Sequence, residues 1–512
     1  MSSEPSDVRP SDLQPEAAAP APSDRSPIYL GDSELDAAMF DDVSYLEKLG
    51  YKQELNRALG LVSSFAVQFS SIAIGSALYT TLIVGLGFFG PASFWSYVVG
   101  GALQVLAVGL AMAQLVSAYP LSGGVYQITN RITRLPFLGW QTGWLIIIAH
   151  TVAVTAIAVS IVPFIAGWFG LAPEGSAQLP WVLGLIVLVT VVNLVSVKVA
   201  AFVNNLGVVC EILGVLLLIG GLLLVKHNTQ PLSILNDSAG TASGGWFGPF
   251  LFAMILPAYL ISSFDATGNA AEETKNAAWN APLGTTLANV SAWLAGGVLI
   301  VLLFVAIPDL NTIMASQTPV RDILLAATGP AITNIFEAFA IVALIATMVV
   351  LQLTGIRVAW SQARDGQLPA ARWMRHINAA RIPVNATIVI GVISVIFALW
   401  SGLLSVLTAL TALAWALAYG IVVTAGLWAV IRKRLPRHPW HYGKFSPIIF
   451  IVAVLWSIVL CVALVLSDPI GVGLGTLGAI LVGVVIYRLV PSARRGKVFG
   501  VNHDVVAVSD TH

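Results

Sequence analysis

The 512-residue chain has little charge. Only 10 % of its residues are Asp, Glu, Lys or Arg, whereas 57 % are hydrophobic, and its mean hydropathy is +0.87. A soluble protein of this length needs a charged surface around its core, and this composition does not supply one. The scarcity of charge excludes a soluble protein and indicates a membrane protein.

Cysteine is also scarce, and the usual catalytic motifs are missing. Cys210 and Cys461 both lie inside apolar segments, where we expect small buried side chains rather than a disulfide or a metal pair. The sequence has no His/Cys metal spacing, no Walker loop and no G-x-S-x-G motif, so neither an ATP-driven pump nor a membrane hydrolase is supported. We expect no enzymatic activity, no cofactor, no metal centre and no nucleic-acid partner.

The two ends of the chain differ from its apolar body. Residues 1–44 are rich in Pro, Ser and Ala and hold ten acidic but only two basic residues, which predicts a disordered acidic tail. Residues 43–57 fit either a short amphipathic surface helix or a plain linker. We therefore expect a membrane domain over residues 45–490, between the tail 1–44 and a second tail over 491–512.

Long apolar segments fill the body of the chain. Twelve of them reach roughly 18 residues, enough to cross about 30 Å of hydrocarbon. They lie near 58–87, 93–118, 138–168, 180–197, 201–225, 247–277, 283–307, 332–360, 382–400, 403–431, 446–466 and 470–490. The sequence predicts an all-α integral membrane protein with twelve transmembrane helices.

The basic residues predict how these helices are oriented. If the N-terminus is cytoplasmic, 23 of the 25 Lys and Arg residues lie on the cytoplasmic side, and only Lys226 and Arg321 lie outside. Basic residues concentrate in cytoplasmic loops. We therefore expect a multi-pass protein of the inner or plasma membrane with both termini in the cytoplasm.

The sixth apolar segment is broken in its middle. Residues 246–278 are largely apolar, but residues 262–269 read Ser-Ser-Phe-Asp-Ala-Thr-Gly-Asn. A carboxylate at the centre of a membrane helix costs about 2.5 kcal/mol or more, and non-helical backbone persists there only where it lines a polar cavity. Broken helices of this kind form the substrate sites of secondary transporters, so a transporter is the first hypothesis.

The first apolar segment has a matching interruption. Residues 68–77 place serines and a glycine at mid-depth of that segment. The two interruptions are five segments apart, which is the offset of inverted repeats over segments 1–5 and 6–10, with segments 11 and 12 appended. We predict broken helices at positions one and six.

Three motifs carry a resemblance to a known family. They are Tyr-Pro-Leu-Ser-Gly-Gly-Val-Tyr at 119–126, Arg-Val-Ala-Trp-Ser-Gln-Ala-Arg-Asp-Gly-Gln-Leu-Pro at 357–369, and Phe-Asp-Ala at 264–266 followed by Ala-Glu-Glu-Thr-Lys-Asn-Ala at 271–277. Over about residues 45–490 the chain resembles the amino acid–polyamine–organocation (APC) permeases. The likeness is closest to the amino acid/choline branch, which includes 4-aminobutyrate and choline permeases.

The resemblance implies a five-plus-five inverted-repeat (LeuT-like) fold, with substrate held between broken helices one and six. Exposed amides at the start of a half-helix attract an anion. A substrate carboxylate is therefore expected at Ile74, Gly75, Ser76 and Ala77. An amino group is expected at the second break, at Ser263, Phe264 and Asp265. Asp265 also fits a structural role, in which its side chain caps the amides from Thr267 onward.

Glu211, in the fifth apolar segment, is the second informative carboxylate. The resemblance implies that many relatives carry a lysine there in place of a sodium ion, so the charge is reversed in this chain. We expect a buried carboxyl group to load and release a proton near neutral pH, which makes Glu211 and Asp265 candidates for proton coupling. The alternative for Glu211 is packing, hydrogen-bonded to helix one or eight.

Other residues have weaker assignments. Tyr79, Phe264 and Trp415 are candidates for stacking on substrate, with Phe264 as a gate. His150 fits substrate contact or a neutral, hydrogen-bonded core histidine. Glu337 fits an outer vestibule or a side chain that snorkels to the surface, and Glu272 and Glu273 fit local pairing with Lys275 or the inner loops as part of a gate. Oxygens near three residues are weak sodium candidates, at Ile72, Thr354 and Ser361.

Together these features predict a secondary active transporter that imports a small amino acid or a 4-aminobutyrate-like amine by alternating access. Protons are the expected coupling ion, and sodium stays open. Besides substrate and ion, we expect contact with membrane lipid, notably anionic lipid at the basic cluster 432–434. Two alternatives remain: a choline or polyamine carrier, and an amino acid sensor that does not transport.

Overall fold

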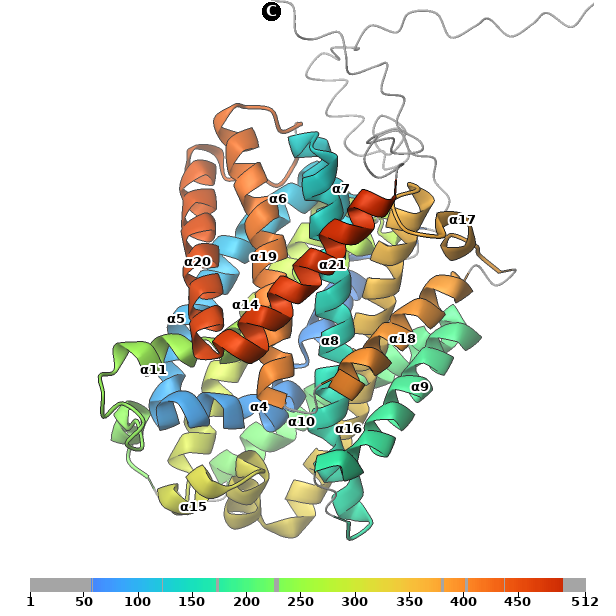
Figure 1. Cartoon of the computed structure of the whole chain (residues 1–512). Coiled ribbons are helices and arrows are strands. Elements are labelled where there is room, and N and C mark those ends of the chain that lie inside the picture. Colours follow the sequence, from blue (N-terminus) through green and yellow to red (C-terminus); the bar gives the residue numbers. More distant parts are fainter. Residues whose placement is uncertain are drawn as a thin grey trace, which may run out of the picture.

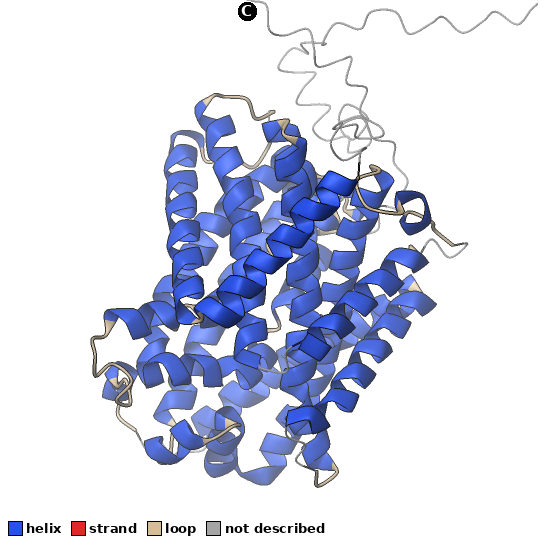
Figure 2. Cartoon of the chain, in the orientation of Figure 1, coloured by secondary structure: helices blue, strands red, loops and turns tan. Residues whose placement is uncertain are grey.

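Helices make up nearly all of the part of the chain that the structure describes (Figures 1 and 2). The computed structural model describes residues 57, 59–121, 123–171, 175–224, 230–378, 382–400, 404–436 and 438–490. Within these ranges there is no strand, and the sole β-bridge joins Leu59 to Thr274. The predicted tails 1–44 and 491–512 lie outside the described residues.

Each of the twelve predicted segments coincides with helical structure. In chain order the segments contain α3 (Leu61–Ile72) and α4 (Ile74–Phe89); α5 (Ser93–Leu103), η2 (Gln104–Gly109) and α6 (Leu110–Ala118); α8 (Pro136–Trp168); α9 (Leu179–Val195); α10 (Val197–Leu224); α11 (Phe247–Phe252), α12 (Ile255–Leu260) and α13 (Ala266–Asn269); α14 (Ala277–Val305); α16 (Pro319–Arg364); α18 (Val384–Trp400); α19 (Leu404–Ile431); α20 (Ser446–Ser467); and η7 (Pro469–Leu474) with α21 (Gly475–Leu489).

The connecting elements are short. They are η1 (Gly90–Ala92), α7 (Gly124–Thr133), η3 (Gly175–Gln178), η4 (Leu232–Asn236), η5 (Ala271–Glu273), α15 (Leu310–Ala315), α17 (Ala371–Met374) and η6 (Gly443–Phe445). Two predicted boundaries move. The division between the fourth and fifth segments lies at Ser196, where the backbone is extended, and α16 begins well before the predicted residue 332, with a kink at Gly329.

Nine helical stretches of the described residues are long and apolar enough to cross a membrane. One of them, Leu61–Ala118, contains the first two predicted segments, and the apolar helices Phe247–Leu260 and Val384–Trp400 are shorter. The chain is thus an all-helical protein built of membrane-spanning elements, while the number of twelve crossings stays a prediction.

The core is built around α8, which stands in the middle of the bundle (Figure 1). Its most apolar 18-residue window is completely buried. A helix that is apolar all round belongs inside a bundle, and α8 packs on both α16 and α19. In α9, α20 and α21, by contrast, many large apolar side chains are exposed, as expected of helices that face lipid.

Helices one and six are broken as the sequence predicts. Helix one is interrupted at Ala73, whose backbone is left-handed (φ 46°), between α3 and α4. Helix six is interrupted between α12 and α13, with Ser263 also left-handed (φ 57°). A left-handed residue turns the chain out of the helix and frees backbone groups on both sides of it.

Candidate functional site

The two breaks are tied together by buried polar side chains. Gln68 of α3 donates its Nε2 to the carbonyl of Ser262 at the second break, 3.3 Å away. Thr347 of α16 donates to the carbonyl of Ser70, which lies just before the first break, at 3.0 Å. These bonds satisfy carbonyls that the broken helices leave without intrahelical partners. The breaks therefore form one buried site against α16.

Glu211 of α10 occupies the start of α4 at the first break. Its carboxylate accepts from the amide of Gly75 at 2.6 Å and from the amide of Ser76 at 3.4 Å, and it also accepts from the Ser76 hydroxyl. A Cβ on Gly75 would lie 2.6 Å from a methyl of Val215, so only glycine permits this approach. A carboxylate at a helix N-terminus is stabilised by these amides and by the helix dipole.

The amides that were predicted to bind a substrate carboxylate are thus held by the protein's own carboxylate. Gly75 and Ser76 donate to Glu211, whereas Ala77 donates its amide to Ala73 within the helix at 2.7 Å. Ile74 is fully buried. Glu211 thus makes a hydrogen bond to helix one, as the packing alternative expects, and its role in proton coupling stays a prediction.

Asp265 at the second break is fully buried and accepts two hydrogen bonds. Tyr419 of α19 donates its hydroxyl at 2.6 Å and Asn269 donates its amide nitrogen at 2.8 Å. No backbone amide of α13 donates to the carboxylate, so the structure does not contain the predicted cap from Thr267 onward. Asp265 instead links helix six to helix ten.

Phe264 lies beside Asp265 but points toward helices two and ten. Its ring packs edge-on against Tyr419, with centroids 5.4 Å apart, and a Cβ on Gly109 of η2 would lie 3.3 Å from it. The side chain is fully buried. Phe264 is therefore packed between elements in this conformation rather than standing free as a gate.

A small cavity lies between the breaks. It leaves a volume of about 20 Å³, which is room for roughly one water molecule. The lining residues come from helices one, three, six, eight and ten: Ser71, Ala77, Thr80, Ile157, Tyr259, Ser262, Leu344, Thr347, Leu351 and Trp415. The site is closed in this conformation, and an amino acid enters only if the helices move.

Trp415 lines this cavity, and His150 packs against Trp415. Their rings meet edge-on, with centroids 5.6 Å apart. His150 Nδ1 lies 2.9 Å from the carbonyl of Ile146, so Nδ1 carries the proton. His150 Nε2 and Trp415 Nε1 are buried and have no hydrogen-bond partner among the described residues. This geometry is that of the hydrogen-bonded core histidine, with one nitrogen left for a further partner.

Tyr79 and two of the three sodium candidates, Thr354 and Ser361, lie outside the breaks, whereas Ile72 directly precedes the first break. The ring of Tyr79 packs against Phe164 and Phe336, with centroid distances of 4.7 and 5.1 Å. Thr354 donates to a carbonyl of its own helix, and Ser361 accepts from Gln127. These two hydroxyls are seven residues apart on α16, about 10 Å along the axis. They do not converge with Ile72 on one ion.

The side on which helix one begins is closed by a latch, formed by Arg57, Leu59, Glu273, Thr274 and Arg357. Leu59 pairs with the chain after α13 through two backbone bonds of 2.8 and 2.9 Å. Arg57 donates to the carbonyl of Thr274 at 2.8 Å, and Arg357 forms an ion pair with Glu273 at 2.8 Å. Glu273 thus pairs with Arg357 of helix eight, and this latch ties helices one, six and eight together.

The other side is closed around Glu337. Its carboxylate lies 3.5 Å from Arg321 and accepts from the indole of Trp168 at 3.3 Å. Glu337 is 1 % exposed, so it does not snorkel to the surface. Glu337 and Arg357 are twenty residues apart on α16, about 30 Å along the helix. The cavity beside Thr347 lies midway between these two closures.

The comparisons with known proteins agree with this architecture. The family profile described as "Amino acid permease" matches residues 59–486. The chain belongs to the amino acid permease family. It is a multi-pass transmembrane transporter of the APC superfamily and not an enzyme, and this sets aside the alternative of a sensor that does not transport.

Several curated relatives of this permease are similar along most of their length. Amino-acid permease BAT1 of Arabidopsis thaliana is 27 % identical over 457 residues, covering 81 % of this chain and 87 % of the relative. Its homologue in Oryza sativa is 28 % identical over 456 residues, covering 82 % and 85 %. Amino-acid permease 2 of Neurospora crassa is 28 % identical over 440 residues, covering 80 % and 79 %.

Sequence reasoning missed four residues of the permease's site. Tyr419 and Asn269 hold Asp265, and Tyr259 and Thr347 line the cavity. Tyr419 is the only tyrosine in residues 403–431. A hydroxyl inside such an apolar segment indicates a polar partner within the bundle. Asn269 follows Asp265 by four residues, the spacing of neighbours on a helix. Thr347 carries no comparable signal, because threonine is common in membrane helices.

Proposed function

We propose that this permease is a proton-coupled secondary active transporter that imports a small amino acid, of the 4-aminobutyrate kind, by alternating access. The proposal includes twelve crossing helices in a five-plus-five inverted repeat with helices 11 and 12 appended. It also includes cytoplasmic termini at the inner or plasma membrane. The observation that carries it is the Glu211 carboxylate on the amides of Gly75 and Ser76.

Those amides can serve one carboxylate at a time. An ionised Glu211 accepts strong, charge-assisted bonds from them, and it repels a second carboxylate at the same place. When Glu211 takes up a proton, it loses its charge and its hold on the amides weakens. A substrate carboxylate then gains the site, so proton binding and substrate binding favour each other. Such a coupling free energy is reciprocal and supports symport.

The second break supplies the complementary charge. Asp265 is buried and held by Tyr419 and Asn269, and a substrate ammonium placed near it compensates the buried negative charge. Alternating access then requires the latch to open on one side and the closure around Glu337 to open on the other.

Replacing Glu211 with Gln tests the coupling. The purified variant in proteoliposomes should still exchange 4-aminobutyrate in counterflow, but it should no longer accumulate it under an imposed pH gradient, because the titrating group is gone. Asp309→Asn is the control, an exposed carboxylate bonded to Thr312 in its own turn and outside the site, and should keep the pH dependence. Unchanged pH-driven accumulation in E211Q would overturn the role of Glu211.

A choline carrier is the second candidate, and one observation favours it. Tyr259 and Trp415 both line the cavity, with ring centroids 6.3 Å apart, and aromatic walls of this kind bind quaternary ammonium ions. Counterflow with 4-aminobutyrate, choline and putrescine separates the candidates. Exchange of choline alone would exclude the amino acid proposal, and exchange of putrescine alone would point to a polyamine carrier.

A further inference from the structure

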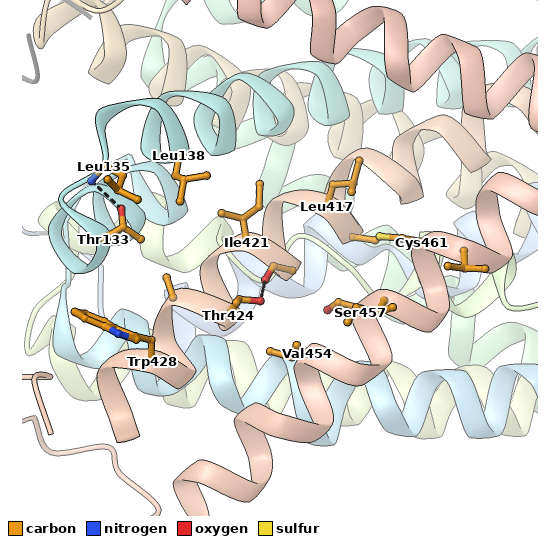
Figure 3. A pocket seen from close by; sticks show the side chains of 15 residues that line it. Thr133, Leu135, Leu138, Leu417, Ile421, Thr424, Trp428, Val454, Ser457 and Cys461 are labelled. Atoms are coloured by element: carbon orange, nitrogen blue, oxygen red, sulfur yellow. Dashed lines mark hydrogen bonds between the residues drawn. The ribbon is translucent and has the colours of Figure 1, made fainter. Parts of the chain in front are cut away.

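A long groove lies on the membrane-facing side of the bundle, away from the helix breaks. It runs between α19, α20 and the corner where α7 meets α8, and its volume is about 680 Å³ (Figure 3). None of the cavity residues at the breaks lines it, although α19 contributes to both sites. The groove is therefore distinct from the proposed substrate site.

The walls of the groove are apolar. Apart from Thr133, Thr424 and Ser457, nearly all of the lining side chains are hydrocarbon or aromatic (Figure 3). Each of these three hydroxyls donates to the carbonyl four residues earlier on its own helix, at 2.8, 2.6 and 2.8 Å. A hydroxyl bonded in this way offers little to a polar ligand. The groove accordingly fits a hydrocarbon chain.

The length of the groove matches one leaflet of a bilayer. Along α19 it extends from Ala416, near the middle of the helix, to Trp428, near its end. Twelve helical residues span about 18 Å, close to half of the roughly 30 Å hydrocarbon thickness. A phospholipid acyl chain that reaches from the interface to the bilayer centre has this length.

Cations lie at the end of the groove that would meet the interface. The guanidinium of Arg434 is 4.9 Å from the ring centroid of Trp428. Arg134 directly follows Thr133, which lines the same end, and both arginines are exposed. Basic residues at a membrane surface attract anionic headgroups, and guanidinium groups bind phosphate well.

We propose that this groove binds an anionic phospholipid, with one acyl chain between α19 and α20 and the phosphate at Arg434 and Arg134. The combination of an apolar channel one leaflet long with cations at its mouth selects this occupant over a second copy of the permease. Lipid binding in this groove involves no step of the transport cycle, so this proposal does not depend on the proposed function.

Native mass spectrometry of the full-length permease with added phosphatidylglycerol or phosphatidylcholine tests this. Wild type should retain phosphatidylglycerol in preference. Arg434→Gln should lower its retention about five-fold, the effect of one surface charge, while Arg372→Gln, a similarly exposed arginine elsewhere, should not. Thr424→Trp fills the groove and should lower retention of both lipids.

Val392→Trp is the matched control for bulk, since Val392 is 52 % exposed on α18 and outside the groove. It should retain lipid as wild type does, and unchanged melting temperatures should show that all four variants fold. Equal retention of the two lipids, or full retention in R434Q and T424W, would overturn the proposal. A dimer that T424W dissociates without lipid loss would assign the groove to a second copy instead.

Discussion

At the scale of single residues, the site depends on two buried carboxylates that are held in different ways. Glu211 is held by backbone amides and one hydroxyl of helix one, whereas Asp265 is held by the side chains of Tyr419 and Asn269. Backbone amides at a helix start are available to any anion, including a substrate. The donors to Asp265 are buried side chains of helices six and ten, so these bonds depend on how the two helices pack.

Removing the hydroxyl in Tyr419→Phe should destabilise the permease by about 1.5–3 kcal/mol, the worth of a hydrogen bond to a charged group. The phenyl ring keeps its packing against Phe264, so the loss is confined to the bond. Chemical denaturation of the purified protein measures it. In an Asp265→Asn background the same change should cost clearly less. Equal costs in the two backgrounds would show that the bond to Asp265 is not the cause.

At the scale of elements, the latch decides whether the site can open. It joins the chain before α3, the chain after α13 and the last third of α16. All three segments belong to the helices that carry the breaks or face them. Movement of helix six away from α16 therefore has to break the ion pair between Arg357 and Glu273.

Arg357→Gln should favour the conformation that is open on this side. A cysteine placed at Ser71 in the cavity wall, with Cys210 and Cys461 replaced, should then react faster with a membrane-impermeant maleimide. The pair is partly exposed, so its worth is at most about 1 kcal/mol and the acceleration about five-fold. The charge swap Arg357→Glu with Glu273→Arg should restore slow labelling. If the double variant is labelled as fast as Arg357→Gln, the ion pair does not hold the latch closed.

At the scale of the whole molecule, a polar contact between α7 and the end of α16 makes the stability of the fold depend on pH. Asp365 accepts from Tyr126 at 2.7 Å and from Gln127 at 3.0 Å. Burial raises the pKa of the Asp365 carboxyl from 3.8 to about 6, against the opposing effects of Arg364, the two donors and Arg131. The folded permease therefore binds a proton here that the unfolded chain releases.

The melting temperature of wild type should fall relative to that of Asp365→Asn as pH rises from about 4 to 7. Between pH 3.8 and about 6 the folded state binds more protons than the unfolded state, so stability decreases with rising pH. Asp309→Asn is the control, because bonds to Thr312 lower the pKa of Asp309 below 3.8, so the difference between wild type and D309N should stay nearly constant from about pH 4 to 7. A constant difference between wild type and D365N across this range would contradict the raised pKa.

Much of the fold follows from patterns that are local in the chain. Apolar run length locates the helices, since α8, α19 and α20 coincide with predicted segments to within a few residues. The breaks follow from Ser, Gly and Asp at mid-depth of apolar runs, because such residues are costly inside hydrocarbon unless they line a cavity. Boundaries that depend on one left-handed or extended residue, such as Ser196, were less accurate.

The partners at the site could not be read in this way. Glu211 and Gly75 are 136 positions apart, and Tyr419 and Asp265 are 154 apart. Which side chain reaches which break depends on how five helices pack around a cavity, and no local pattern encodes that. The same limit explains why the sequence groups Ile72, Thr354 and Ser361 as sodium candidates, although Thr354 and Ser361 lie about 10 Å apart along α16.

The sequence by itself determined that this protein is a membrane-embedded permease with interrupted helices at positions one and six, because length, hydropathy and motif are properties of the chain. The tertiary structure alone decided what fills the interruptions. It put the permease's own Glu211 on the amides expected to meet a substrate, and it joined Asp265 to Tyr419. Hydrogen bonds act over about 3 Å, so only the packed fold determines which donors and acceptors meet.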